Sequence, residues 1–266
     1  MADRLTEILA DLAAESDQLD GWVRDLPDDG WLTQTPASGW TIAHQIAHLH
    51  WTDDASRRAI DRDAFGDVLK QATADPTGYV DKAADALAAL APAELLAQWR
   101  AGRTQLADAL RDVPQGERIA WFGPPMSPAS MATARLMETW AHGHDVAEAL
   151  GVEVPTTSRV RHVCHLGVRT RGFAYAVRGL EPPETDVYVE LRGPGGETWT
   201  WGSSEAYERV SGSAWDFALL VTRRRHLADV DVRAAGSDAE QWLTIAQAFA
   251  GMPGRDPVRL ADRERA

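Results

Sequence analysis

Apolar residues recur at helical intervals through the first half of the chain, with charged and polar residues between them. The run from Leu5 to Leu26 is one example, and its period predicts an amphipathic helix. Pro27-Asp-Asp-Gly30 is typical of a helix end, and Pro92 suits the first turn of a later helix. The helices predicted in this way cover residues 3–26, 41–51 with a charged continuation, 55–75, 80–110 in two parts, and 129–150.

The second half of the chain changes character, because alternating polarity appears beside the helical patterns. Residues 186–191 alternate before the glycine-rich turn Gly193-Pro-Gly-Gly196, and residues 197–201 complete a predicted hairpin. The other elements predicted here are helices over residues 158–178, 213–224 and 238–250, and a short strand over 229–233. We therefore predict an α+β chain, with a four-helix bundle over residues 1–152 and a small α+β domain over residues 158–258.

Two segments of the predicted bundle carry ionisable side chains four residues apart. Glu138 and His142 form one pair, and His44 and His48 form the other. Four residues are close to one turn, so both members of a pair leave the same face of their helix. Two histidines and one carboxylate on facing helices can hold a divalent first-row metal and leave positions for water or substrate. We expect His48, Glu138 and His142 to be the metal ligands.

Three further residues near these ligands are candidate catalytic residues. His44 lies one turn before His48. It is a fourth ligand, a residue that supports a ligand, or an acid/base group. Asp145 follows His142 by three residues, where it can orient the imidazole. Arg135 precedes Glu138 by three residues, where it can fix the carboxylate. No cofactor-binding residue is assigned.

The same spacings also arise on solvated helix faces, so a purely structural role for both pairs stays open. Each pair stands beside a tryptophan and within apolar residues, which favours a buried site over a solvated face. On the residues alone, a metal site and a structural role are therefore about equally supported.

Composition and charge narrow the range of partners. The net charge of −13 argues against a nucleic-acid surface or an anionic membrane as the main partner. No run approaches the roughly 18 apolar residues of a membrane helix, and the first residues lack a signal-peptide pattern. The single cysteine, Cys164, excludes an intramolecular disulfide and a thiolate-rich zinc site, and we expect it to be buried. We expect a cytoplasmic protein, monomeric or homodimeric, that acts on a small molecule.

Several motifs resemble those of a known family. The motifs that carry the resemblance are Gly39-Trp40-Thr41, Ala47-His48-Leu49, and Glu138-Thr-Trp-Ala-His142 with Asp145. They resemble the DinB-like superfamily of metal-binding four-helix bundles and, more narrowly, its actinobacterial branch with mycothiol-dependent maleylpyruvate isomerase. Residues 210–221 and 247–249 look like the C-terminal domain of that branch, whose fold is similar to that of sterol carrier proteins.

The resemblance implies a function as well as a fold. It implies a metal triad of His48, Glu138 and His142, with zinc as the first choice and nickel, iron or manganese as alternatives. It also implies mycothiol as a cosubstrate and a metal-activated thiolate that performs isomerisation or S-transfer on a small electrophile. Two other functions stay open: a thiol-independent metal-dependent hydrolase or lyase, and a non-enzymatic small-molecule-binding protein. The polar segment after Trp51 departs from the family pattern and is expected to border the pocket, so the resemblance does not give the substrate.

Overall fold

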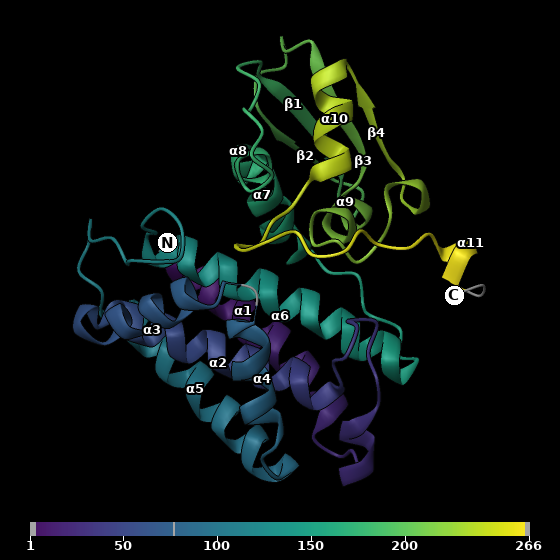
Figure 1. Cartoon of the computed structure of the whole chain (residues 1–266). Coiled ribbons are helices and arrows are strands. Elements are labelled where there is room, and N and C mark those ends of the chain that lie inside the picture. Colours follow the sequence, from purple (N-terminus) through teal and green to yellow (C-terminus); the bar gives the residue numbers. More distant parts are fainter. Residues whose placement is uncertain (1–3, 77, 264–266) are drawn as a thin grey trace. The chain divides into compact units, whose positions relative to one another are not determined.

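The computed structural model describes residues 4–76 and 78–263 and divides the chain into two compact units, Met1–Val154 and Pro155–Ala266. The first unit is helical, and the second contains a four-stranded sheet with helices (Figure 1). The predicted domain limits, 1–152 and 158–258, stay predictions.

The first unit consists of long helices that pack side by side. Its helices are α1 (Arg4–Val23), the short 3-10 helix η1 (Asp28–Leu32), α2 (Ile42–Ile60), α3 (Arg62–Ala74), α4 (Tyr79–Ala88), α5 (Pro92–Asp112) and α6 (Pro128–Leu150). Helix α2 packs against α4, α5 and α6, and α1 packs against α6. The apolar faces that meet there are buried, including Leu19, Ile42, Ile46, Leu95 and Trp99. Burial of these faces, rather than helix propensity alone, holds the helices together.

Local signals set the ends of the two helices that matter most for function. The hydroxyl of Ser127 accepts a hydrogen bond from the backbone N–H of Ser130 and caps α6. Gly151 ends α6 in the left-handed conformation that glycine adopts at low cost. Thr41 is the residue before α2, in an extended conformation. Helix α6 also buries Arg135 and Asp145, which is unusual for charged side chains and marks a site rather than a plain core.

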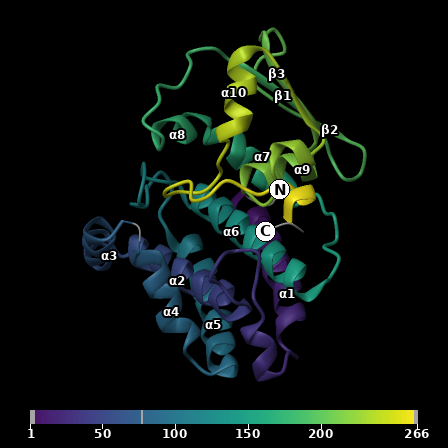
Figure 2. The same cartoon turned by 45° about the vertical axis from the view of Figure 1, so that its right-hand side comes forward.

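The second unit is a mixed sheet with helices on one face. Its elements are α7 (Val160–Arg169), α8 (Arg171–Ala176), β1 (Val187–Arg192), β2 (Thr198–Trp201), β3 (Glu208–Ser213), α9 (Ala214–Val221), the 3-10 helix η2 (Leu227–Asp229), β4 (Val232–Ala235), α10 (Ser237–Ile245) and α11 (Leu260–Arg263). The strand order is β2-β1-β3-β4, with β1 and β3 parallel and the other pairs antiparallel. The inward side chains Val189, Leu191, Trp199 and Val210 are buried, and α7, α9 and α10 pack against the sheet (Figure 2).

The prediction of the sheet was incomplete. Strand β3 lies in the middle of the sheet but was not predicted. Val210 is its one fully buried residue and also its one apolar residue, so the sequence almost lacks the alternation of apolar and polar residues that marks a strand. Strand β4 lies at 232–235 instead of 229–233. Gly212 of β3 has a φ of 150°, and a side chain there would meet the carbonyl oxygen of Asp231 at 2.1 Å. The close approach of the neighbouring backbone therefore requires glycine.

Two other predictions concern Cys164 and membrane segments. Cys164 is fully buried, its thiol donates to the carbonyl oxygen of Ala214, and burial raises the pKa of the thiol. A buried structural thiol is therefore confirmed, and Cys164 lacks the exposure of a nucleophile. Among the helices of the described residues, none is long and apolar enough to cross a membrane.

Candidate metal centre

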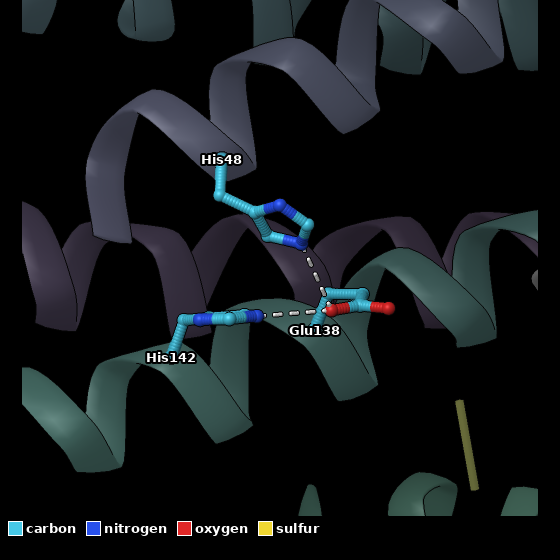
Figure 3. A group of neighbouring side chains, drawn as sticks. All are labelled: His48, Glu138 and His142. Carbon is cyan, nitrogen blue, oxygen red and sulfur yellow. Dashed lines mark hydrogen bonds and ion pairs between the residues drawn. The ribbon is translucent and has the colours of Figure 1, made fainter. Parts of the chain in front are cut away.

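The candidate site lies where α2 and α6 pass each other in opposite directions. Gln45 contacts His142, whereas Ser56, further along α2, contacts Met131, which comes earlier in α6. This arrangement brings His48 of α2 opposite Glu138 and His142 of α6 (Figure 3).

The three side chains converge on one carboxylate oxygen. Nε2 of His142 lies 3.2 Å from Oε2 of Glu138, and Nε2 of His48 lies 3.6 Å from the same oxygen. One potential ligand atom from each residue lies within 4.8 Å of the other two. Figure 3 shows both imidazole rings directed at that oxygen, while the second oxygen of Glu138 points away. Such a cluster of two ring nitrogens and one carboxylate oxygen matches the donor set of a divalent transition metal.

Glu138 carries a negative charge in this setting. Burial raises the pKa of its carboxyl, but hydrogen bonds with His142 and His48 and the positive charge of Arg135 outweigh that effect. The net result is a pKa well below the usual value for glutamate. The carboxylate is therefore available as an anionic ligand throughout the neutral range.

A chain of hydrogen bonds fixes the orientation of His142. The hydroxyl of Thr35 donates to the carbonyl oxygen of Trp40, and the amide nitrogen of Gln45 donates to the oxygen of that hydroxyl, each at 2.8 Å. The amide oxygen of Gln45 then lies 2.5 Å from Nδ1 of His142 and accepts a hydrogen bond from its N–H. Because Nδ1 is engaged with Gln45, Nε2 is the ring nitrogen left to face Glu138 and His48.

Aromatic packing, in contrast, positions His48. Its ring lies 5.2 Å from the ring of Trp40 and 5.8 Å from the ring of Trp51, measured between centroids. Trp40 also stacks on His142 at 5.9 Å, so one indole contacts both imidazoles. Nδ1 of His48 is buried and makes no hydrogen bond to the described residues. The ring is held by its neighbours rather than by a polar partner on its far side.

His44 does not join the other three. Its Nδ1 accepts a hydrogen bond from the backbone N–H of Thr41 at 3.3 Å, and its Nε2 lies 3.2 Å from Oδ1 of Asp85 in α4. The Thr41 hydroxyl lies 2.8 Å from the same Nδ1, which completes a cap at the start of α2. Both ring nitrogens are thereby engaged away from the cluster.

Arg135 and Asp145 lie beside the cluster at longer distances. Nη2 of Arg135 lies 3.9 Å from Oε1 of Glu138, and its guanidinium stacks on Trp121 at 5.1 Å. Oδ2 of Asp145 lies 3.9 Å from Nδ1 of His142. At these distances Arg135 acts on Glu138 through charge, and Gln45, rather than Asp145, forms the hydrogen bond to the imidazole.

The sequence analysis missed two buried polar residues of this region. Gln45 is fully buried and stands three residues before His48, so helical spacing alone could have placed it on the ligand face. Asp53 of α2 is also buried, and burial raises the pKa of its carboxyl to about 7, while the charges of Arg135 and Arg103 oppose this change. No short motif marks Asp53, because its burial depends on the packing of the other helices.

Comparison with known families gives two matches. The model described as "Mycothiol maleylpyruvate isomerase N-terminal domain" matches residues 12–147, which include all three members of the cluster. A second model, described as "Wyosine base formation", matches residues 183–235, the segment that holds the sheet.

Two relatives match nearly the whole chain. The proteins MT0041 and Rv0036c of Mycobacterium tuberculosis, strains CDC 1551 / Oshkosh and ATCC 25618 / H37Rv, are both named uncharacterized. Each is 60% identical to this chain over 248 residues, which is 93% of the chain and 96% of the relative.

Solved structures show the same fold at low sequence identity. The crystal structures of mycothiol-dependent maleylpyruvate isomerase and of a point mutant of it give TM-scores of 0.59 and 0.58 at 15% identity. Each match covers 88% of this chain and 95% of the other. The predicted fold class, α+β with a DinB-like N-terminal part, is thus confirmed. Because the first family model spans just over half of the 266 residues, the chain belongs to the mycothiol maleylpyruvate isomerase N-terminal domain family.

Proposed function

We propose that the protein is a metal-dependent enzyme that uses a thiol, with mycothiol as the first candidate, for isomerisation of a small electrophilic substrate or for S-transfer to it. The observation that carries this proposal is the convergence of His48, Glu138 and His142 within 4.8 Å. Family membership supports it, because the family is described by a mycothiol-dependent isomerase.

The residues present fit a divalent ion. Two neutral imidazoles and one carboxylate suit zinc, with nickel, iron or manganese as alternatives. The amide oxygen of Gln45 accepts a hydrogen bond from Nδ1 of His142, which leaves Nε2 as the ring nitrogen that would bind a metal. The carboxylate of Glu138 balances part of the ion's charge in a buried setting. A divalent ion held there would supply the Lewis acidity that lowers the pKa of a thiol and yields thiolate near neutral pH.

The reaction that fits this site is reversible addition of the thiol. The sulfur of the thiolate forms a bond to the β-carbon of a conjugated carbonyl compound, and the electron pair of the double bond moves to the carbonyl oxygen. Rotation about the new single bond and expulsion of the thiolate restore the double bond in the other geometry. If a proton is added to the α-carbon instead, the thiol remains attached and the outcome is S-transfer.

The protein's own residues prepare the site for this chemistry. Trp40 covers one side of both imidazoles and excludes water from them. Arg135 keeps a buried positive charge close to Glu138, where it favours the anionic form of that carboxylate and of an oxyanion nearby. Asp145 lies 3.9 Å from His142 and is our candidate for moving a proton at the site.

The proposal extends to the localisation, the partners and the oligomeric state of the protein. The acidic net charge and the single buried cysteine support a cytoplasmic protein with a small-molecule substrate and without a nucleic-acid partner. We propose a monomer or homodimer.

Cobalt substitution tests the role of the thiol. Mycothiol added to the cobalt-loaded protein should change its visible absorption and produce a sulfur-to-cobalt charge-transfer band. The same titration with the alcohol analogue of the thiol controls for binding without sulfur coordination. A spectrum that stays unchanged at saturating mycothiol would refute the thiol-dependent mechanism and favour a hydrolase or lyase.

A further inference from the structure

Five aromatic side chains from separate parts of the first unit meet beside the metal cluster. We call them the aromatic wall: Trp51 of α2, Phe65 of α3, Tyr79 of α4, and Trp121 and Phe122 of the loop between α5 and α6. Phe122 lies 4.9 Å from Trp121, 5.4 Å from Phe65 and 6.4 Å from Trp51, and Trp51 lies 5.5 Å from Tyr79, all between ring centroids. These separations are those of interacting rings, so the five side chains form one continuous surface.

The aromatic wall has a buried base and an accessible rim. Phe65 is 1% exposed and stacks on Trp121 with their planes 6° apart. Phe122 is 36% exposed, and Trp51 and Tyr79 are each partly exposed. Part of each of these rings is in contact with water, although burial of aromatic surface is favourable. A grouped, partly exposed aromatic rim is typical of a binding surface.

The wall is continuous with the metal cluster at two points. The Trp51 ring lies 5.8 Å from that of His48. At the other point, the guanidinium of Arg135 stacks on Trp121, and its Nη2 lies 3.9 Å from Glu138. A molecule that reaches the cluster along this side therefore passes the rim of the wall.

The loop that carries Trp121 and Phe122 is held in place before any ligand binds. Ile119 and Met126 exchange two backbone hydrogen bonds of 2.8 Å and close the loop at its base. Ile119 is buried, and the side chain of Arg118 donates to the carbonyl oxygen of Pro125. Pro125 follows a second proline, which further restricts the backbone. A fixed ring binds with a smaller loss of entropy than one that must first be ordered.

We propose that the aromatic wall binds a planar apolar group, an aromatic ring or conjugated chain, of the small molecule whose reacting carbon lies at the metal cluster. Phe122 is then a specificity-determining residue. The position of the reacting carbon at the metal cluster rests on the proposed function, but the binding of the apolar group to the aromatic wall does not. The partly exposed rings of the wall are Trp51, Tyr79, Trp121 and Phe122. Four partly exposed side chains suit one ring system and offer far less area than the roughly 800 Å² per partner of a protein interface.

Two unreactive ketones test the aromatic wall. The probes are 4-phenyl-2-butanone, which has a phenyl group and no double bond for a thiol to attack, and 2-butanone, which lacks the ring. Their dissociation constants for the metal-loaded protein can be measured by ligand-observed NMR. We expect the phenyl ketone to bind at least about tenfold more tightly, as burial of one ring on an aromatic surface predicts.

Three variants assign the effect to the wall. Phe122→Ala should weaken binding of the phenyl ketone by about tenfold and leave 2-butanone unchanged. Phe122→Tyr should retain the preference, because it keeps the ring. Tyr207→Ala is the matched control, because Tyr207 is 95% exposed in the second unit and lies outside the wall. Equal affinity for the two ketones, or a Phe122→Ala variant that binds the phenyl ketone as the wild type does, would overturn the proposal.

The same probes separate this proposal from the proposed function. If His48→Ala, which lacks a metal ligand, still prefers the phenyl ketone, the wall stands whether or not thiol chemistry is found. If mycothiol perturbs the cobalt spectrum but the two ketones bind equally, the proposed function stands and the aromatic wall does not bind substrate.

Discussion

The substitution Gln45→Leu removes the hydrogen-bond acceptor that orients His142 and keeps nearly the same volume. In the wild type the Gln45 amide oxygen accepts from Nδ1 of His142 at 2.5 Å. Leucine removes this acceptor, and Oδ2 of Asp145, at 3.9 Å from Nδ1, is too distant to replace it with a hydrogen bond. The imidazole can then adopt the other tautomer, in which Nε2 carries the proton and cannot bind a metal.

The magnitude follows from the behaviour of groups that support metal ligands. Loss of such a hydrogen bond lowers metal affinity about 10- to 100-fold, which is about 1.4–2.8 kcal/mol at room temperature. An unsatisfied buried donor costs a similar amount, about 1–3 kcal/mol. We therefore expect the dissociation constant for zinc to rise by one to two orders of magnitude.

Competition with a chromophoric chelator measures this constant. Gln105→Leu is the matched control, because Gln105 is an exposed glutamine on α5 and should retain wild-type affinity. Circular dichroism of both metal-free variants checks that the fold is intact. A Gln45→Leu protein that binds zinc as tightly as Gln105→Leu would refute the idea that Gln45 sets the tautomer of His142.

Two further predictions concern stability. Burial raises the folded-state pKa of Asp53 from 3.8 to about 7. The stability that the protonated carboxyl contributes is therefore complete below about pH 4 and is lost as the pH rises through about 7. Chemical denaturation of metal-free Asp53→Asn should therefore show greater stability than the wild type at about pH 8, with a gap that narrows toward about pH 5; a gap independent of pH would contradict this. Gly167→Ala should destabilise the protein by about 1–3 kcal/mol, because its new methyl group would meet the buried side chain of Val221 at 2.8 Å. Gly172→Ala, a helical glycine with nothing within 4 Å, is the control and should be neutral or stabilising in the same thermal melts.

The helices of the first unit could be predicted because their signals are local. The period of the apolar residues, Pro92 at the start of α5 and Ser127 before α6 each act within a few residues. Strand β3 could not be predicted, because its place is fixed by parallel pairing with β1 rather than by its own pattern. Its inward-facing Val210 gains its environment only when the sheet has formed.

The candidate site shows the same division between local and long-range information. The four-residue spacing was enough to bring Glu138 and His142 together, and helix packing brought His48 to them. His44 has the same spacing from His48, but a second local rule applies to it, because its three-residue distance from Thr41 fits a helix cap. The role of Gln45 was hidden, because its partner His142 lies 97 residues further along the chain.

Metal content is the most direct test of the central claim that His48, Glu138 and His142 bind a metal ion. Elemental analysis after dialysis should find close to one divalent first-row ion per chain in the wild type and in His44→Ala, whose ring lies outside the cluster. It should find almost none in His48→Ala. A wild-type protein that takes up no metal and keeps its thermal stability in chelator, or a His48→Ala variant with the full metal content, would contradict the account.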